Sequence, residues 1–276
     1  MHVLGGPKHT YLLLSGVQAD RPVRLAQGLD LSPVNSPPGP ELVLPNIKEP
    51  LDLHIISLFL PWVESQLCVK GKGRKDVAVR AWNATWDVLL LGAIFHSQTS
   101  CVLQSSAALE NFTLKSRISV MNYLLQGYSR REGRKLKEEE CGWLELNFQA
   151  AQDLLQQHSF QTAVHCLSTY HWHTIPRARL SLLWAGIESL FSVDSEIVFR
   201  VSLYVAKFLA PEDPPIQRQL FEQVKRLYKT RSQAVHGARI KGDAHAQVEE
   251  TAELLRVLIV NCVERRSLPV LASLAP

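Results

Sequence analysis

After Cys141, apolar residues recur along most of the chain at intervals of three and four, which is the spacing of one face of an α-helix. The run Ala178–Phe191 is the clearest, because most of its apolar residues fall on one side of a helix: Leu180, Leu183, Trp184, Ile187, Leu190 and Phe191. Four further stripes have the same spacing: 143–170, 196–209, 214–236 and 244–266. Residues 141–268 are therefore predicted to form one bundle of about five helices.

Residues with capping preferences mark the limits of these helices. Asp213–Pro214 suits a helix start, because proline is well tolerated in the first turn. Gly237 suits a helix end, because glycine adopts the left-handed conformation common just after the last turn. The last helix is expected to begin after Asp243. The length of the first stripe favours a break near His158.

Residues 1–50 hold eight of the 15 prolines of the chain. Proline has no amide donor and pushes the residue before it toward extended geometry. This segment is therefore predicted to be loop, with short strands at Thr10–Val17 and Glu41–Leu44, and no function is assigned to it.

Residues 51–140 are predicted to be a helical region of unknown role. Their apolar stripes with helical spacing cover Leu51–Cys68, Val77–Phe95 and Leu114–Tyr128. The predicted fold class is accordingly mainly α: a helical bundle preceded by an N-terminal extension of mixed loop, short strand and helix.

Composition narrows the functional classes. The net charge of +4 permits an anionic partner without requiring one, so any basic surface has to be local. The five cysteines include no CxxC pair, which argues against a zinc site and against a disulfide framework. No metal or cofactor is predicted. No signal peptide and no membrane span are recognised, so a cytoplasmic location is expected.

The segment Lys225–Gly237 carries the chemistry that stands out most. Arg231 offers a planar, permanently charged fork of donors for a phosphate. His236 has an unperturbed pKa of about 6.5, which suits proton transfer in both directions near neutrality. Together they are suited to a phosphodiester. The alternative is a plain helix end, where basic residues followed by glycine are favoured for structural reasons.

Three blocks of sequence resemble an Apea-like HEPN domain, within residues 145–265. The blocks are Arg179–Phe191, Asp194–Ile197 and Leu227–Gly237. The resemblance implies an HEPN-type helical bundle, usually dimeric, whose Rx4–6H motif cleaves RNA without a metal ion in many members, often in phage defence or toxin–antitoxin systems. Arg231 and His236 match that motif, whereas Ser232 stands where many members carry Asn, Asp or His.

Helix geometry indicates how Arg231 and His236 would cooperate. Residues five apart on a straight helix point about 140° apart, so one helix would direct both at the same phosphate only if its pitch changed before Gly237. A two-fold dimer, which the resemblance favours, would instead line one cleft with residues of both copies. There His236 would act as base, acid or both on the RNA 2′-hydroxyl, and Arg231 would stabilise charge on the phosphate.

Other residues are assigned supporting roles. Glu188 borders an apolar stripe and needs a cationic partner, for which Arg231 and Arg200 are the candidates; a purely structural ion pair is the alternative. Ser232 is predicted to support the motif. Five cations are candidates for contact with an RNA backbone, a solvated basic face being the alternative: Arg200, Lys225, Lys229, Arg239 and Lys241.

The sequence thus predicts an endoribonuclease that cleaves RNA by 2′-hydroxyl attack, acts as a homodimer, and serves as a defence or toxin effector under an antitoxin or another regulator. One alternative is a catalytically silent RNA- or nucleotide-binding or sensor module. Another is a helical scaffold in which His236 is only a helix cap.

Overall fold

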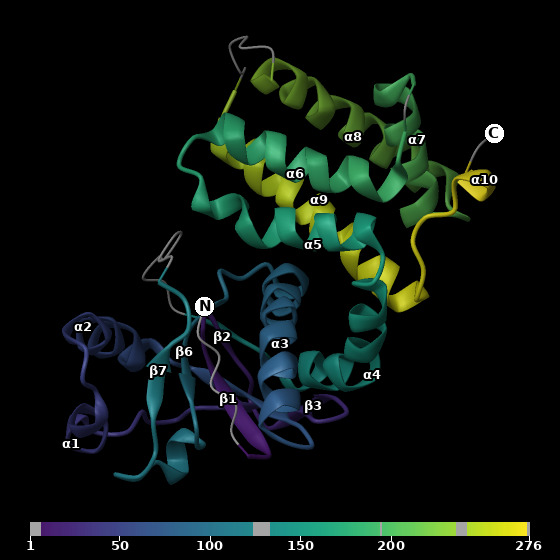
Figure 1. The fold of residues 1–276 in the computed structure, drawn as a ribbon. Helices are drawn as coiled ribbons and strands as arrows, with labels where there is room; N and C mark the ends of the chain where they lie inside the picture. Colours follow the sequence, from purple (N-terminus) through teal and green to yellow (C-terminus); the bar gives the residue numbers. More distant parts are fainter. Residues whose placement is uncertain (1–6, 124–132, 194, 236–241, 275–276) are drawn as a thin grey trace. The chain divides into compact units, whose positions relative to one another are not determined.

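The computed structural model describes residues 7–123, 133–193, 195–235 and 242–274. The chain divides into two compact units, whose elements are labelled in Figure 1. The first, termed the sheet unit, comprises residues 1–92 and 97–149. The second, termed the helical unit, comprises residues 93–96 and 150–276.

A six-stranded antiparallel sheet, in the order β3-β4-β5-β1-β6-β7, is the centre of the sheet unit. Its strands are β1 (His9–Ser15), β3 (Val23–Ala26), β4 (Leu29–Pro33), β5 (Ser65–Lys70), β6 (Ser100–Ser105) and β7 (Ile118–Val120). A separate parallel pair consists of β2 (Val17–Gln18) and β8 (Arg134–Lys135). Strand β1 pairs with β5 on one side and β6 on the other. Its continuous apolar run is typical of a strand covered on both faces.

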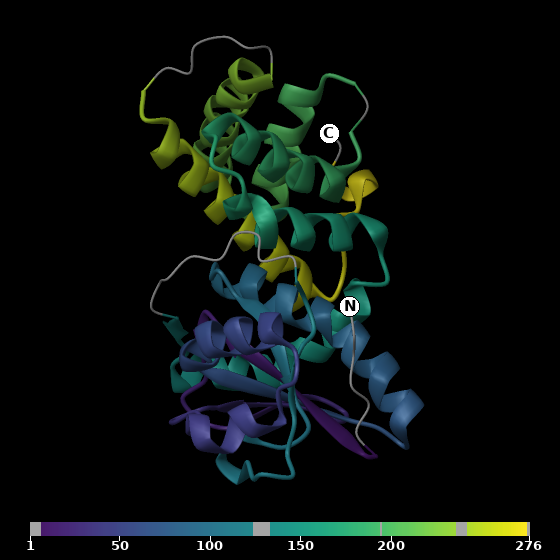
Figure 2. The same ribbon diagram turned by 60° about the vertical axis from the view of Figure 1, so that its left-hand side comes forward.

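Helices cover the two faces of this sheet. Leu13 of β1 packs into a buried cluster with Ile56 and Phe59 of α2 (Pro50–Phe59). Its neighbours Leu12 and Leu14 point to the opposite face, because side chains alternate along a strand, and both are also fully buried. Figures 1 and 2 show α2 on one face and α3 (Arg74–Phe95), which begins in this unit, on the other. The other helical segments that begin in this unit are α1 (Pro40–Val43), η1 (Leu44–Asn46), η2 (Leu60–Trp62), η3 (Leu109–Asn111) and α4 (Glu138–Leu154).

The prediction of a mainly α fold is wrong, because the chain contains this antiparallel sheet and is a mixed α and β structure. The predicted helix Val77–Phe95 is present as part of α3. The stretch Leu51–Cys68 instead divides into α2 and β5, and the described part of Leu114–Tyr128 contains β7.

Strand length explains these errors. A run of three to six apolar residues fits a buried strand and a buried helix turn equally well, so periodicity does not distinguish them. The two candidate strands of the proline-rich segment had different outcomes. Thr10–Val17 contains most of β1, whereas Glu41–Leu44 is largely α1, with Pro40 in the first turn.

The helical unit contains α5 (His158–Thr169), η4 (Tyr170–Trp172), α6 (Pro176–Phe191), α7 (Ile197–Leu209), α8 (Pro214–Val235), α9 (Ala244–Arg265) and α10 (Leu271–Leu274). Helix α6 is central, because it packs against α5, α8 and α9 (Figure 1). Its Trp184, Ile187 and Phe191 are fully buried. Among the described residues, no helix combines the length and the apolar composition needed to cross a membrane.

Capping groups set the limits of the helices much as the sequence indicated. Asp243 precedes α9 and its carboxylate accepts hydrogen bonds from the backbone amides of His245 and Ala246. Asp213 likewise accepts from the amide of Ile216 at the start of α8. The long first stripe, 143–170, is broken into α4 and α5, which starts at the predicted position, His158.

Candidate active site

Arg231 lies one turn before the end of α8 and points at Glu188 of α6. Its Nη2 atom is 3.3 Å from each oxygen of the Glu188 carboxylate. Both side chains are about one-quarter exposed, so the pair is screened by solvent only in part. Of the two partners considered for Glu188, the structure therefore places Arg231 against it. Arg200 pairs instead with Glu196, four residues earlier on the surface of α7, at 3.4 Å.

An aromatic ring lies against the guanidinium of this ion pair, and a second ring packs against the first. The Arg231 guanidinium carbon is 5.4 Å from the ring centroid of Tyr228, which lies one turn earlier on α8. Tyr228 meets the buried Trp184 of α6 edge to face, with centroids 4.9 Å apart. Burial raises the pKa of Tyr228, and the Glu188 charge and a hydrogen bond to that carboxylate raise it further. The Tyr228 phenol therefore stays protonated at neutral pH beside the Glu188 carboxylate.

The pair leaves hydrogen-bonding capacity unused. Among the described residues, the buried atoms Nε of Arg231 and Oε1 of Glu188 have no hydrogen-bond partner. A paired guanidinium and carboxylate usually form two parallel bonds, whereas here one nitrogen is shared between both oxygens. An unpaired buried donor costs free energy, so a small rotation that gives Arg231 a further acceptor, such as a phosphate oxygen, would be favourable.

Arg177, in the first turn of α6, fixes the last turn of α8. Its Nη1 atom donates to the carbonyl oxygens of Gln233 at 3.0 Å and Ala234 at 3.2 Å, two groups that the end of a helix leaves without helical partners. Sequence reasoning missed this residue. Cations favour helix ends, but Arg177 is more than 50 residues away in sequence from the carbonyls it binds, so no local pattern reveals the contact.

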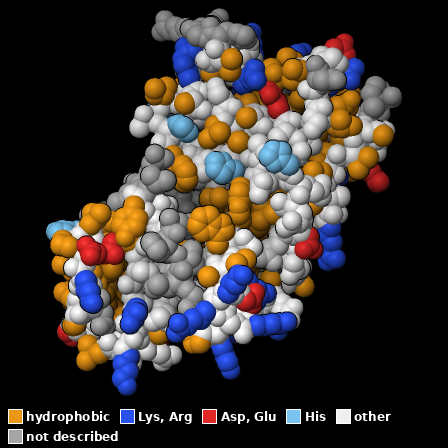
Figure 3. All heavy atoms as spheres, viewed as in Figure 1, with side chains coloured by type: hydrophobic (Ala, Val, Ile, Leu, Met, Phe, Trp, Pro, Cys, Tyr) orange, Lys and Arg blue, Asp and Glu red, His pale blue; other side chains and the backbone are white. Residues whose placement is uncertain are grey.

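The other predicted site residues fall into two groups. His236, Arg239 and Lys241 lie outside the described residues. Ser232 is partly buried on α8, next to Arg231, while Lys225 and Lys229 are exposed on the same helix. In Figure 3, Lys and Arg side chains of the helical unit gather along the edge where Figure 1 places α8.

Acidic residues neutralise part of the charge of α8. Arg226 forms an ion pair with Glu250 of α9, which lowers the pKa of that carboxyl. Lys225 is 4.0 Å from Glu222 on its own helix, a weak and exposed contact. The exposed basic face of α8 therefore includes Lys225 and Lys229, whereas the partly buried Arg231 lies about 160° around the helix from Lys229 and faces α6.

A cavity of about 420 Å³ lies elsewhere in the helical unit, between the ends of α7 and α9 and the short α10. It is lined in part by Lys207, Phe208, Gln217 and Arg265, and the described residues around it include no carboxylate. Gln217 precedes Arg231 by 14 residues, about 21 Å along α8. The cavity is therefore not the site of the Arg231–Glu188 pair.

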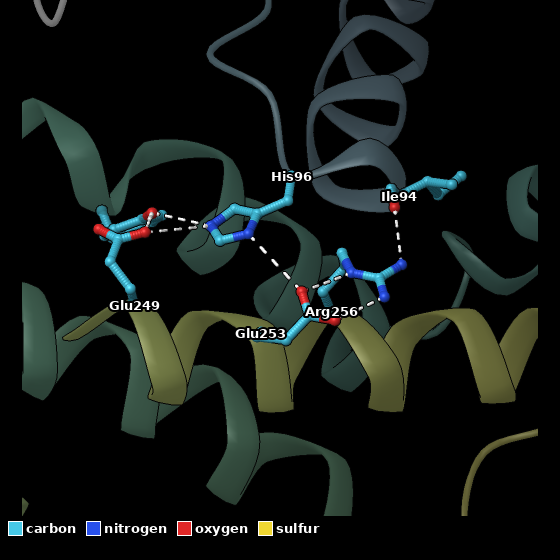
Figure 4. A network of polar contacts seen from close by, with 6 residues as sticks. Ile94, His96, Glu249, Glu253 and Arg256 are labelled. Atoms are coloured by element: carbon cyan, nitrogen blue, oxygen red, sulfur yellow. Dashed lines mark hydrogen bonds and ion pairs between the residues drawn. The ribbon is translucent and has the colours of Figure 1, made fainter. Parts of the chain in front are cut away.

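A second polar cluster in the helical unit surrounds His96, whose backbone is left-handed with φ of 50° (Figure 4). Its Nε2 atom is 2.9 Å from the Tyr170 hydroxyl. Its ring also faces Glu249 at 3.8 Å and Glu253 at 3.7 Å. Arg256 binds Glu253 and reaches the carbonyl oxygen of Ile94. These contacts hold residues 93–96 against α9, which is a structural role.

Comparison of the chain with family models, with curated proteins and with solved structures gave no match. Among the described residues, no group of three or more His, Cys, Asp or Glu side chains is placed to hold a metal ion.

Proposed function

We propose that this chain is a metal-independent endoribonuclease whose site lies at the end of α8. The observation that carries the proposal is Arg231, a guanidinium oriented by Glu188 and Tyr228, with an unused buried donor, five residues before His236 on a basic helix. The same proposal assigns residues 145–265 to the Apea-like HEPN family, because of the three blocks of sequence that lead to this motif.

The reaction requires one nucleophile, one base, one acid and a stabilised phosphate. His236 takes the proton of a ribose 2′-hydroxyl, whose oxygen attacks the adjacent phosphorus. The bond from phosphorus to the 5′-oxygen breaks, and that oxygen receives a proton from a second His236, supplied by the other copy of the chain. Arg231 stabilises the charge that develops on the phosphate oxygens. The products are a 2′,3′-cyclic phosphate and a 5′-hydroxyl, and DNA, which lacks the 2′-hydroxyl, is not cut.

The proposal includes partners and a place of action. A homodimer would bring two motifs to one cleft, and an antitoxin or another regulator would keep the nuclease silent until it is needed. A cytoplasmic location would give such an effector access to RNA.

The test is cleavage of bulk tRNA and of an end-labelled RNA hairpin in EDTA. We expect the wild type to cut, His236→Ala to cut about 10²–10⁴-fold more slowly, and Arg231→Ala about 10²–10³-fold more slowly. Arg226→Ala is the matched control, because Arg226 is on the same helix but is neutralised by Glu250. Equal cleavage by wild type and His236→Ala, with the fold intact by circular dichroism, would refute the proposal.

One observation favours a second candidate, an RNA-binding module without nuclease activity. Glu188 neutralises Arg231, so in this structure the guanidinium is engaged with a carboxylate and not presented as a free cation. This candidate predicts that the wild type binds RNA at low salt and leaves it intact in every condition, including after Glu188→Gln.

A further inference from the structure

Two phenylalanines of the helical unit form an aromatic pair that the core does not require. Phe199, in the first turn of α7, and Phe221 of α8 have ring centroids 5.8 Å apart with planes at 72°. Phe199 is 54% exposed, although the inner face of α7 is already filled by the fully buried Val201 and Val205. The adjacent Val198 is also exposed, at 41%. The exposed Phe199 ring and the partly buried Phe221 ring therefore present an apolar surface to solvent where α7 packs on α8.

Cations surround this pair. Lys225 places its ammonium 5.7 Å from the Phe221 ring centroid. By helical geometry Arg218, Lys225 and Lys229 all lie within about 80° of Phe221 around α8, so they share its face. All three are exposed.

Two carboxylates are close to this surface and reduce its charge. Glu222 contacts Lys225 at 4.0 Å, and Glu196 contacts Arg200 at 3.4 Å. Among the residues that the structure describes here, four cations, Arg200 included, therefore face two acids. Both ion pairs are exposed and worth little, so either cation can change partner when a more highly charged anion arrives.

We propose that Phe199 and Phe221 are a stacking platform for unpaired bases of RNA, with Lys225 and Lys229 as the backbone contacts. Exposed aromatic rings beside cations are the combination that holds single strands without sequence readout, because every base has a face that can stack. A paired duplex buries those faces, so the platform selects single-stranded segments and loops. This rests on the function proposed above and names the form of RNA that the site takes.

The position of the platform fits that role. Phe221 precedes Arg231 by ten residues, which is about 15 Å along α8. Lys225 and Lys229 occupy the two turns between them. Around α8, Arg231 lies about 80° from Phe221, on the side opposite the two lysines, so the platform would hold nucleotides that flank the cleaved bond, not the bond itself.

The experiment measures binding separately from cleavage. Fluorescence anisotropy at low salt compares an unstructured 12-nucleotide RNA with a blunt duplex of the same length, using the full chain with His236→Ala as the background. Phe199→Ala and Phe221→Ala should each weaken single-strand binding about 5- to 150-fold and leave duplex binding nearly unchanged. Phe199→Leu keeps apolar bulk but loses the flat ring, so its affinity for the single strand should lie between those of the background protein and Phe199→Ala. Trp172→Ala removes an exposed ring outside this face and should have no effect.

The outcomes separate this inference from the proposed nuclease activity. If the wild type does not cleave RNA, the nuclease activity is refuted, and the binding measurements still decide whether the platform exists. Single-strand affinity that is unaffected in both alanine variants, or is restored fully by Phe199→Leu, would overturn the platform. So would absence of RNA binding by the background protein. A change of oligomeric state in Phe199→Ala, measured by light scattering, would overturn it too, because the pair would then be a contact between copies.

Discussion

Arg231 and Glu188 are held at a distance and geometry that are good but not optimal for an ion pair, and this makes them sensitive to a single substitution. Glu188→Gln leaves a guanidinium that is three-quarters buried without its counter-charge. Removing one partner of a fully buried pair costs about 3–5 kcal/mol, so about 1–3 kcal/mol is expected for this partly exposed one, measured by urea unfolding. Cleavage should also fall, because Arg231 loses its orientation.

The control for that prediction is Glu196→Gln, which breaks the exposed pair with Arg200 on α7. It should cost less than about 1 kcal/mol. Equal losses for the two variants would mean that the Glu188–Arg231 pair is only a surface contact.

The contribution of Glu250 to the stability of the fold should depend on pH. Its pKa is lowered from 4.5, first by the hydrogen bond from Arg226, with a smaller contribution from Gln223. A lowered native pKa means that the carboxylate's contribution to stability is complete above 4.5 and is lost as the pH falls through the native value. Thermal unfolding of wild type and Glu250→Gln should therefore differ at pH 7 and converge in acid. A difference that persists unchanged at pH 2–3 would contradict this assignment.

At the scale of elements, close contact between helices depends on Gly186 of α6. A Cβ at this position would lie 2.7 Å from the Leu255 side chain of α9 and 3.0 Å from the Cβ of Cys166 on α5. Overpacking costs about 1–3 kcal/mol, against about 1 kcal/mol gained in helix propensity, so Gly186→Ala should be neutral to destabilising by about 2 kcal/mol. Gly142→Ala in α4 adds a Cβ that meets nothing within 4 Å, and should stabilise by about 1 kcal/mol. If calorimetry gave a stability change of the same sign for both variants, the packing around Gly186 of α6 would be able to relax.

The sequence located the elements of the helical unit because their apolar stripes are long. Helices α6 to α9 each repeat the three-four spacing over several turns, and Asp213 and Asp243 cap α8 and α9, so their places were predictable. The sheet was not, since β6 and β7 are short and β1 pairs with β6 about 90 residues away. At the site, Glu188 could be assigned a cation by burial alone, whereas the contact of Arg177 with the end of α8 depends on how α6 packs and has no signature in the sequence.

At the scale of the whole molecule, the proposed reaction calls for two copies of the chain. Arg231 faces α6 from a helix that continues without a break to Val235, and residues five apart on such a helix diverge by about 140°. If one cleft draws on His236 of both copies, a mixed dimer of wild type and His236→Ala keeps only one of the two histidines that the reaction uses, so it should cleave far more slowly than the wild-type dimer. Refolding a fixed amount of wild type together with an excess of His236→Ala should therefore reduce cleavage of labelled RNA below that of the same amount refolded alone, and wild-type cleavage should rise faster than linearly with protein concentration. Cleavage strictly proportional to wild-type concentration, with no loss on mixing, would place the whole site within one chain.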